Sequence, residues 1–258
     1  HVPFHEPAGW SRDLSAELHS LARMRVNEKD IVTLYASETP DGQACALAVK
    51  RYLEAAFPGI VCRVDVVEGL QVTDAVRFRT KGVLEFTRKV LREIDGHGPE
   101  NVVLNPTGGF KSLVPYTVLI GMIRRVRARY IFEQSSELIE LPSMPVEFAH
   151  ARLAPFLDVL ERIDRETCIS RKEWEKEIPH EAREELEALF EFENGCVTLS
   201  PVGILVLGEL GQARAFVPYL SRCSLEDLLK IGQLAGRNPQ EFIERLARNP
   251  RQLEEKTH

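Results

Sequence analysis

The chain has 258 residues, of which 44% are hydrophobic and 28% are charged, and its formal net charge at neutral pH is −6. This length allows one large or two modest domains with buried cores, and the composition is that of a globular protein. The negative balance argues against a surface that coats nucleic acid broadly, while a local basic pocket for a small anion stays compatible with it.

Cysteine usage and hydropathy indicate the compartment. The five cysteines form no Cys-x-x-Cys pair and no metal-type spacing with histidine, so we expect free thiols, no metal site and no cofactor. No apolar run approaches the roughly 20 residues that span a bilayer, and no secretory pattern opens the chain. We therefore expect a cytoplasmic protein without membrane contact. The first residue is His1 rather than Met, which leaves open whether native residues precede it.

Strand and helix patterns alternate through the first 141 residues. Helices are expected at 11–24, 43–57, 81–94 and 113–126. Strands are expected at 31–36, 60–67, 102–104, 130–132 and 138–141, the last of them antiparallel. This order predicts an α/β domain, a Rossmann-like, mostly parallel sheet with helices on both faces.

Residues 101–112, NVVLNPTGGFKS, carry the strongest functional signal. The apolar run 102–104 predicts a buried strand of a parallel sheet. Pro106, Gly108 and Gly109 then predict a sharp turn into the next helix. Such a turn points free backbone N–H groups and the positive end of the helix at a ligand above the sheet.

The side chains of the same segment suit an anionic ligand. Lys111 adds a cation and Thr107 and Ser112 add hydroxyls, so a phosphate-bearing ligand is predicted. A Walker A loop is excluded, because Phe110 separates the glycines from Lys111 and the earlier glycine is missing. The alternative is a tight strand-to-helix turn in which Lys111 is a solvated surface residue.

Two further segments are expected at the same edge, where open α/β sheets bind ligands. Ser37 and Thr39, in the loop after the first strand, are candidate ligand residues, and Asp41 is either an N-cap or part of the site. Gln134 and Ser135, after the strand at 130–132, are candidate donors to a base or a phosphate.

Arginines occur at two other places. Arg77 and Arg79 are expected to be solvated, although they could approach the ligand. A second group could bind nucleic acid, but we favour the view that it complements the negative end of the preceding helix. That group consists of Arg124, Arg125, Arg127 and Arg129.

The run NPTGGFKS at 105–112 resembles the Asn-x-Thr-Gly-Gly-aromatic-Lys signature of the CRISPR-associated Rossmann-fold (CARF) proteins, which sense cyclic oligoadenylates. The resemblance covers roughly residues 10–147. It implies a homodimer that binds one ring, expected to be cyclic tetra-adenylate, across its dyad. The family's usual first strand with a Ser/Thr-rich loop is not found here, so slow ring cleavage, known in some members, stays open.

The resemblance also implies roles for the residues of the loop. Lys111 would pair with phosphate, Thr107 and the backbone of Gly108 and Gly109 would donate hydrogen bonds, and Asn105 would hold the loop. Phe110 and Ser112 complete the expected ligand contacts from this segment.

The pattern changes from about residue 146. Helices are expected at 153–163, within 173–190 with a division at Pro179, and at 202–210. Between them Asn194 and Gly195 predict the turn of a hairpin. Helices followed by a two-stranded wing suggest a winged-helix-like module in a mainly helical region. The acidic run 181–193 argues against DNA binding by this module and favours coupling or dimerisation.

We therefore expect three divisions: a CARF-like ligand-binding domain at 1–145, a winged-helix-like linker or dimerisation domain at 146–215, and a helical segment at 216–258. The last has expected helices at 225–235 and 239–247 and could begin an effector domain. Arg251 and His258 match the Arg-x4–6-His spacing of HEPN ribonucleases, a match that arises often by chance.

The leading hypothesis is a cyclic oligoadenylate sensor of type III CRISPR antiviral defence that controls a C-terminal effector. One alternative is an enzyme, either a ring nuclease or a ligand-activated ribonuclease with an RNA substrate. Another is a ligand-regulated winged-helix transcription factor.

Overall fold

The structure is a computed structural model that describes residues 15–71, 73–131, 137–141 and 153–214. The chain divides into two compact units, His1–Leu210 and Gly211–His258. Several predictions lie outside the described residues: the ligand roles of Gln134 and Ser135, the helices at 225–235 and 239–247, and the Arg251–His258 spacing.

The first region of the chain follows the predicted alternation. Its elements are α1 (Ala16–Arg23), β1 (Ile31–Ser37), α2 (Pro40–Ala56), β2 (Val61–Val67), α3 (Ala75–Arg77), a π-helical turn (Phe78–Gly82), α4 (Val83–His97), β3 (Val103–Leu104), α5 (Val114–Ile123), β4 (Arg127–Ile131) and β5 (Leu138–Leu141). Short 3-10 turns occupy Pro99–Asn101 and Lys111–Leu113. The predicted α/β class is confirmed.

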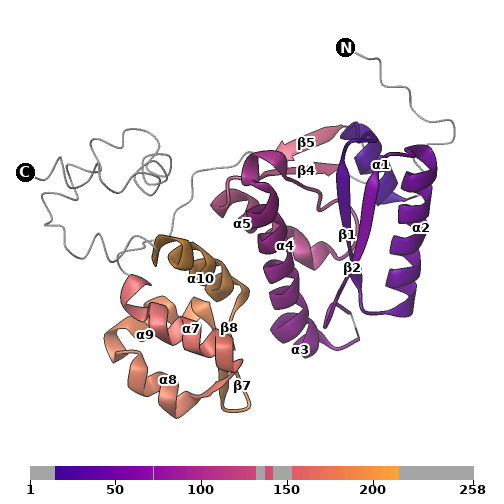
Figure 1. Ribbon diagram of the computed structural model, residues 1–258. Helices are drawn as coiled ribbons and strands as arrows, with labels where there is room; N and C mark the ends of the chain where they lie inside the picture. The colour runs from indigo at the N-terminus through magenta and orange to yellow at the C-terminus, as the bar shows by residue number, and fades with distance from the viewer. Residues whose placement is uncertain (1–14, 72, 132–136, 142–152, 215–258) are drawn as a thin grey trace, which may run out of the picture. The chain divides into compact units, whose positions relative to one another are not determined.

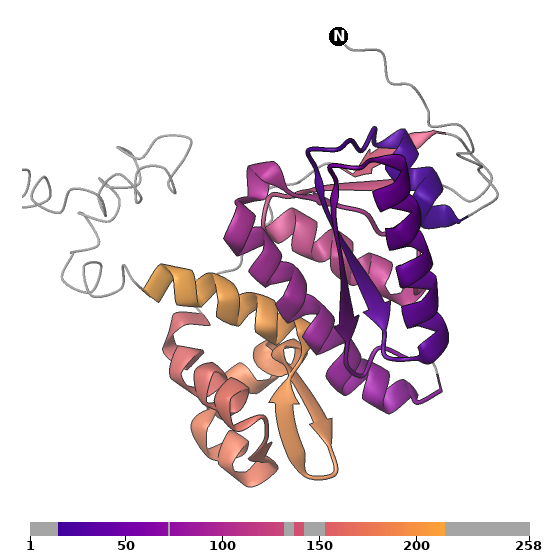
Figure 2. The same ribbon diagram turned by 45° about the vertical axis from the view of Figure 1, so that its right-hand side comes forward.

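The strands form two hydrogen-bonded ladders. Strand β1 runs parallel to β2 along its whole length, and the two lie side by side in both views (Figures 1 and 2). In the second ladder β3 is parallel to β4, and β4 is antiparallel to β5 as predicted. Strand β3 covers two residues, and Pro106, two positions on, has no N–H with which to extend a ladder.

Helices cover both faces of these strands. Leu53 of α2 is fully buried in a cluster with Val32 of β1 and Cys62 of β2, to which α1 also contributes. On the other face α4 and α5 contribute Val90 and Ile120 to a separate cluster. Figure 1 shows α2 on one side of β1 and β2 and α4 on the other. Two apolar faces per sheet are what parallel strands joined by helical crossovers require.

Two local predictions in this region are wrong. The N-cap of α2 is Thr39 rather than Asp41, because the Thr39 hydroxyl accepts a hydrogen bond from the N–H of Gly42 at 3.2 Å. Helix α5 ends at Ile123, so Arg127 and Arg129 lie on strand β4 and do not complement its negative end. Arg129 instead pairs across the ladder with Glu140 at 2.9 Å.

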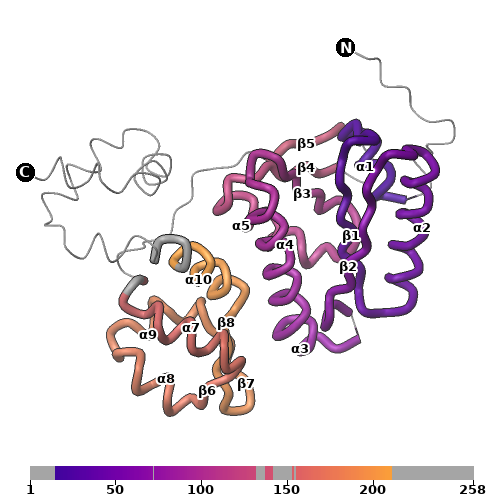
Figure 3. Tube along the Cα trace, in the orientation of Figure 1, coloured from indigo at the N-terminus to yellow at the C-terminus, as the bar shows by residue number. Residues whose placement is uncertain are grey.

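The second region combines helices with a small antiparallel sheet. Its elements are a 3-10 turn (Ala154–Phe156), α7 (Leu157–Glu166), β6 (Ile169–Ser170), α8 (Arg171–Glu177), α9 (His180–Leu186), a second 3-10 turn (Glu187–Leu189), β7 (Phe190–Glu193), β8 (Cys196–Leu199) and α10 (Pro201–Arg214). The sheet order is β6-β8-β7, and Figure 3 labels all three strands. The predicted hairpin is present: Asn194 and Gly195 have φ values of 50° and 78°, the positive-φ turn that this pair favours.

One cysteine pair departs from the expected free thiols. Cys168 and Cys196 form a disulfide with a Cα–Cα distance of 5.7 Å, while Cys45 and Cys62 are free. The two cysteines are 28 positions apart in the chain. They meet because β6 pairs with β8 through Ser170 and Cys196, a long-range pairing that cysteine spacing does not reveal.

Candidate functional site

The glycine loop, residues 105–111, joins β3 to the turn before α5, and Asn105 fixes its start. The Asn105 side-chain oxygen accepts a hydrogen bond from the N–H of Thr107 at 3.2 Å. Its amide nitrogen donates to the hydroxyl of Ser20 on α1 at 2.8 Å. Ser20 is fully buried, so Asn105 ties the loop to an anchored helix.

Thr107 ties the loop to the neighbouring strand. Its hydroxyl oxygen accepts a hydrogen bond from the N–H of Ile131, the last residue of β4, at 3.1 Å. A threonine hydroxyl that accepts one hydrogen bond can still donate another. Thr107 can therefore hold the loop and contact a ligand at the same time.

The two glycines differ in their surroundings. Gly109 has a φ of +81°, and no heavy atom lies within 4 Å of the position that a Cβ would take. A side chain there would be strained by the backbone conformation rather than by contact. Gly108 faces the side chain of Glu17 on α1, whose Cγ lies 2.6 Å from the position of a Cβ. Gly109 is thus open on the surface, and Gly108 is covered on one side.

The end of the loop leads into the helix. Phe110 packs edge-on against Phe78, with 5.9 Å between the ring centroids. Lys111 and Ser112 are exposed at the start of the 3-10 turn that precedes α5. The loop thus places an exposed cation and an exposed hydroxyl directly after the open backbone of Gly109.

The loop after β1 uses its hydroxyls internally. The Ser37 side chain is buried and lies 2.8 Å from the hydroxyl oxygen of Thr39, which also caps α2. A ligand contact by Ser37 or Thr39, as predicted, has to compete with these bonds. In the structure both residues stabilise the loop through these hydrogen bonds.

Glu38, in the same loop, forms an ion pair with Arg77 and also accepts a backbone hydrogen bond. Its carboxylate accepts from Arg77 Nε at 3.0 Å and Nη2 at 2.9 Å, and from the N–H of Gly69 at 2.8 Å. The hydrogen bonds from Arg77, and then the one from Gly69, lower the pKa of Glu38 from 4.5 to about 2. Arg77 is thus held by Glu38, although its side chain keeps some access to water. Arg79 pairs with Glu191 at 3.4 Å, and its side chain is 51% exposed, so it is solvated as expected.

These contacts connect the candidate segments. Glu38 binds Arg77, and the neighbouring Phe78 packs against Phe110 of the glycine loop. The loop after β1, the helical segment Ala75–Gly82 and the glycine loop therefore form one continuous set of contacts. Local sequence patterns do not reveal the Glu38–Arg77 pair, since its members are 39 positions apart.

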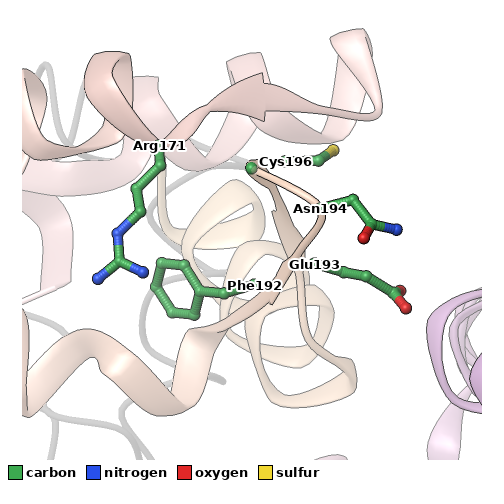
Figure 4. Close-up of a pocket in the computed structure, with 6 residues that line it drawn as sticks. Arg171, Phe192, Glu193, Asn194 and Cys196 are labelled. Carbon is green, nitrogen blue, oxygen red and sulfur yellow. The ribbon is translucent and has the colours of Figure 1, made fainter.

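A separate hollow lies at the hairpin of the second region, with a cavity of about 200 Å³. Figure 4 shows the side chains of Arg171 and Phe192 turned toward one another, with the guanidinium 5.5 Å from the ring centroid. Glu193 and Asn194 point to the other side. None of the predicted site residues lines this hollow.

Among the described residues, no group of three or more potential metal ligands (His, Cys, Asp or Glu) could hold a metal ion.

The matched family covers the region that holds both loops. A family model described as CRISPR-associated protein (Cas_APE2256) matches residues 12–144, just over half of the chain. The chain belongs to this family. The matched range contains α1, the glycine loop and all strands through β5, so the family match of this CRISPR-associated protein lies in its α/β region. The comparison with curated proteins gives no match. No helix in the described part of this CRISPR-associated protein has the length and apolar character needed to cross a membrane.

Proposed function

We propose that this CRISPR-associated protein is a CARF-type sensor that binds a cyclic oligoadenylate at the glycine loop. The observation that carries the proposal is Gly109, which holds a positive φ with open space around it. It lies in the loop between the parallel strand β3 and the 3-10 turn that leads into α5. This is the backbone arrangement that lets amides approach a phosphate closely. We expect a ring of four nucleotides because the loop resembles the CARF signature.

Each residue of the loop has its own role in binding. Exposed Lys111 pairs with a phosphate, and the backbone of Gly108 and Gly109 donates hydrogen bonds to it. Thr107 donates through the hydroxyl whose oxygen is already held by Ile131. The role of Asn105 is to hold the loop through its bonds to Thr107 and Ser20.

A homodimer suits a ligand made of identical repeats. One copy of the loop reaches part of a ring, whereas an isologous two-fold interface brings a second copy to the opposite side. Helix α5 is a candidate for this interface because it is apolar on all sides and leaves several side chains partly exposed. These are Val114, Tyr116, Val118, Leu119 and Met122.

Signal transfer to the second region completes the proposal. Within the His1–Leu210 unit, Arg88 of α4 pairs with Asp164 of α7 at 2.5 Å, and Arg124 pairs with Glu209 of α10 at 2.6 Å. The Arg124 side chain is 7% exposed, and a paired charge with so little access to water resists rearrangement. Such pairs support the transmission of a ligand-induced conformational change from the α/β region to a C-terminal effector.

Incubation with radiolabelled cyclic tetra-adenylate tests the proposal against its enzymatic alternative. A sensor retains the ring on a filter and returns it intact, whereas a ring nuclease converts it to linear oligoadenylate. A labelled RNA added with the ring detects a ligand-activated ribonuclease, and a gel shift with duplex DNA tests the transcription-factor alternative. Failure to retain the ring at all would overturn the proposal.

A further inference from the structure

Glu17 of α1 lies against the glycine loop, 91 positions away in the chain, and sequence patterns gave it no role. A Cβ added to Gly108 would overlap the Glu17 carboxylate and lie 2.6 Å from its Cγ. The carboxylate therefore occupies the space beside the backbone that is proposed to bind phosphate. Gly108 is compatible with this approach because it has no side chain.

Helix α1 holds Glu17 in place. Its N-cap Ser15 accepts a hydrogen bond from the N–H of Leu18 at 3.1 Å, and Leu18 is buried in the core shared with α2. Three positions after Glu17, the buried Ser20 accepts the hydrogen bond from Asn105. Residues three apart lie on the same side of a helix. The contact between Glu17 and the loop thus belongs to an anchored surface rather than to a mobile end.

The carboxylate itself is only partly covered. Among the described residues, the Glu17 side chain has no hydrogen-bond or ion-pair partner, and the residue is half-buried. A carboxylate accepts hydrogen bonds, and it repels a phosphate placed next to it. A phosphate-binding loop with an unpaired carboxylate at its side therefore needs a ligand that carries a donor beside the phosphate.

We propose that Glu17 accepts a hydrogen bond from a ribose 2′-hydroxyl of the bound ligand and so selects ribonucleotides over deoxyribonucleotides. In RNA the 2′-hydroxyl is on the carbon next to the one that bears the 3′-phosphate, which makes it the donor nearest to each backbone phosphate. In dinucleotide sites, too, a glycine turn binds the phosphates while an acidic side chain from another part of the chain accepts a hydrogen bond from the ribose 2′-hydroxyl. The 2′-hydroxyl is also the group by which proteins distinguish RNA from DNA. This inference rests on the proposed function, and it adds the group that the site recognises.

The test compares two rings with two variants. Wild-type protein is titrated with cyclic tetra-adenylate and with the same ring lacking all 2′-hydroxyls, and the dissociation constants are measured by calorimetry. Wild-type protein is expected to bind the ribose ring at least about tenfold more tightly, the range for a hydrogen bond to a charged group. Glu17→Ala is expected to remove most of this preference, through weaker binding of the ribose ring. Glu181→Ala, an exposed position on α9 with the same change of net charge, is expected to keep it.

Two controls keep the outcomes distinct. A ring of inosines, which lacks the adenine amino group, separates the sources of the donor: loss of the Glu17 effect with this ring would assign the contact to the base and overturn the 2′-hydroxyl. Gly108→Ala is expected to lower the melting temperature, and Glu17→Ala in the same chain is expected to restore it, because the clash partner is gone. Absence of that rescue would refute the contact without any ligand.

The remaining results separate the two proposals. Wild-type protein that binds neither ring would overturn the proposed function together with this inference. Ribose-ring binding with a preference that survives Glu17→Ala would overturn the role of Glu17 alone. Tighter binding of both rings by Glu17→Ala would show that the carboxylate only repels phosphate, and would also refute the inference.

Discussion

Replacement of Gly109 by alanine isolates the backbone of the loop. The residue has a φ of +81° with no atom within 4 Å of a Cβ position, so Gly109→Ala introduces backbone strain and no clash. A residue with a Cβ in this conformation costs roughly 1–2 kcal/mol. For a chain of this size the expected fall in melting temperature is about 2–8 °C.

Gly195 provides a matched control for this change. It has a φ of +78°, again with no atom within 4 Å, but it lies in the hairpin turn between β7 and β8. Gly195→Ala should therefore destabilise the protein by a similar amount and leave ring binding unchanged. Gly109→Ala should lose stability and also weaken binding of cyclic tetra-adenylate at least about tenfold, since the loop amides must shift to relieve the strain.

Scanning calorimetry measures the stability of both variants, and a titration with cyclic tetra-adenylate measures their affinity for the ring. Equal stability losses with unequal binding losses support a ligand role for the loop. A Gly109→Ala variant as stable as the wild type would show that the positive φ is not required. A variant that is destabilised but binds normally would remove the loop backbone from the site.

Three further predictions concern single side chains. Lys111→Ala should weaken ring binding by about 1.5–3 kcal/mol, the range for a hydrogen bond to a charged group, with almost no change in melting temperature; an unchanged dissociation constant would exclude Lys111 from the site. Thr39→Ala should cost about 0.5–2 kcal/mol through loss of the α2 N-cap, whereas Asp41→Ala should cost clearly less; the reverse order by urea denaturation would contradict the capping assignment. The pKa of Glu38 is lowered to about 2 by Arg77, so its contribution to stability is present above its ordinary value of 4.5 and is lost as pH falls toward 2. The gap in melting temperature between wild type and Glu38→Gln should therefore narrow from pH 5 to pH 2, and a constant gap would argue against the ion pair.

Local sequence patterns were sufficient for the order of the longer helices and strands. Apolar periodicity predicted the alternation up to β5, and the Asn194–Gly195 pair predicted the hairpin, because each signal lies within a few neighbouring residues. Short elements were missed for the same reason. Strand β6 has two residues, Ile169 and Ser170, too few to show alternation.

The features that the sequence did not predict depend on contacts between residues far apart in the chain. Sequence patterns predict no element between residues 67 and 81, but Asp74 caps a helical stretch whose Arg77 binds Glu38. The choice of Thr39 over Asp41 as N-cap depends on where the chain turns after β1, which composition does not fix. Glu17 lies on Gly108 only because α1 packs beside the loop.

The candidate site was predictable in part. The positive φ of Gly109 and the bond between Asn105 and Thr107 follow from residues within the loop itself. The bond from Asn105 to Ser20 depends on the packing of α1. The internal bonds of Ser37 and Thr39 and the bond from Ile131 to Thr107 depend on the tertiary fold. Local chemistry thus indicated the loop, while packing determined which of its neighbours remain available to a ligand.

The most direct test of the central claim is a calorimetric titration of the full chain with cyclic tetra-adenylate, combined with light scattering on the same sample. Two copies of the glycine loop are expected to hold one ring, so binding should saturate at one ring per two chains, with the mass of a dimer. The melting temperature should rise with ligand concentration, because the ring binds only the folded state. Saturation at one ring per chain, or a monomer that binds with full affinity, would contradict the account.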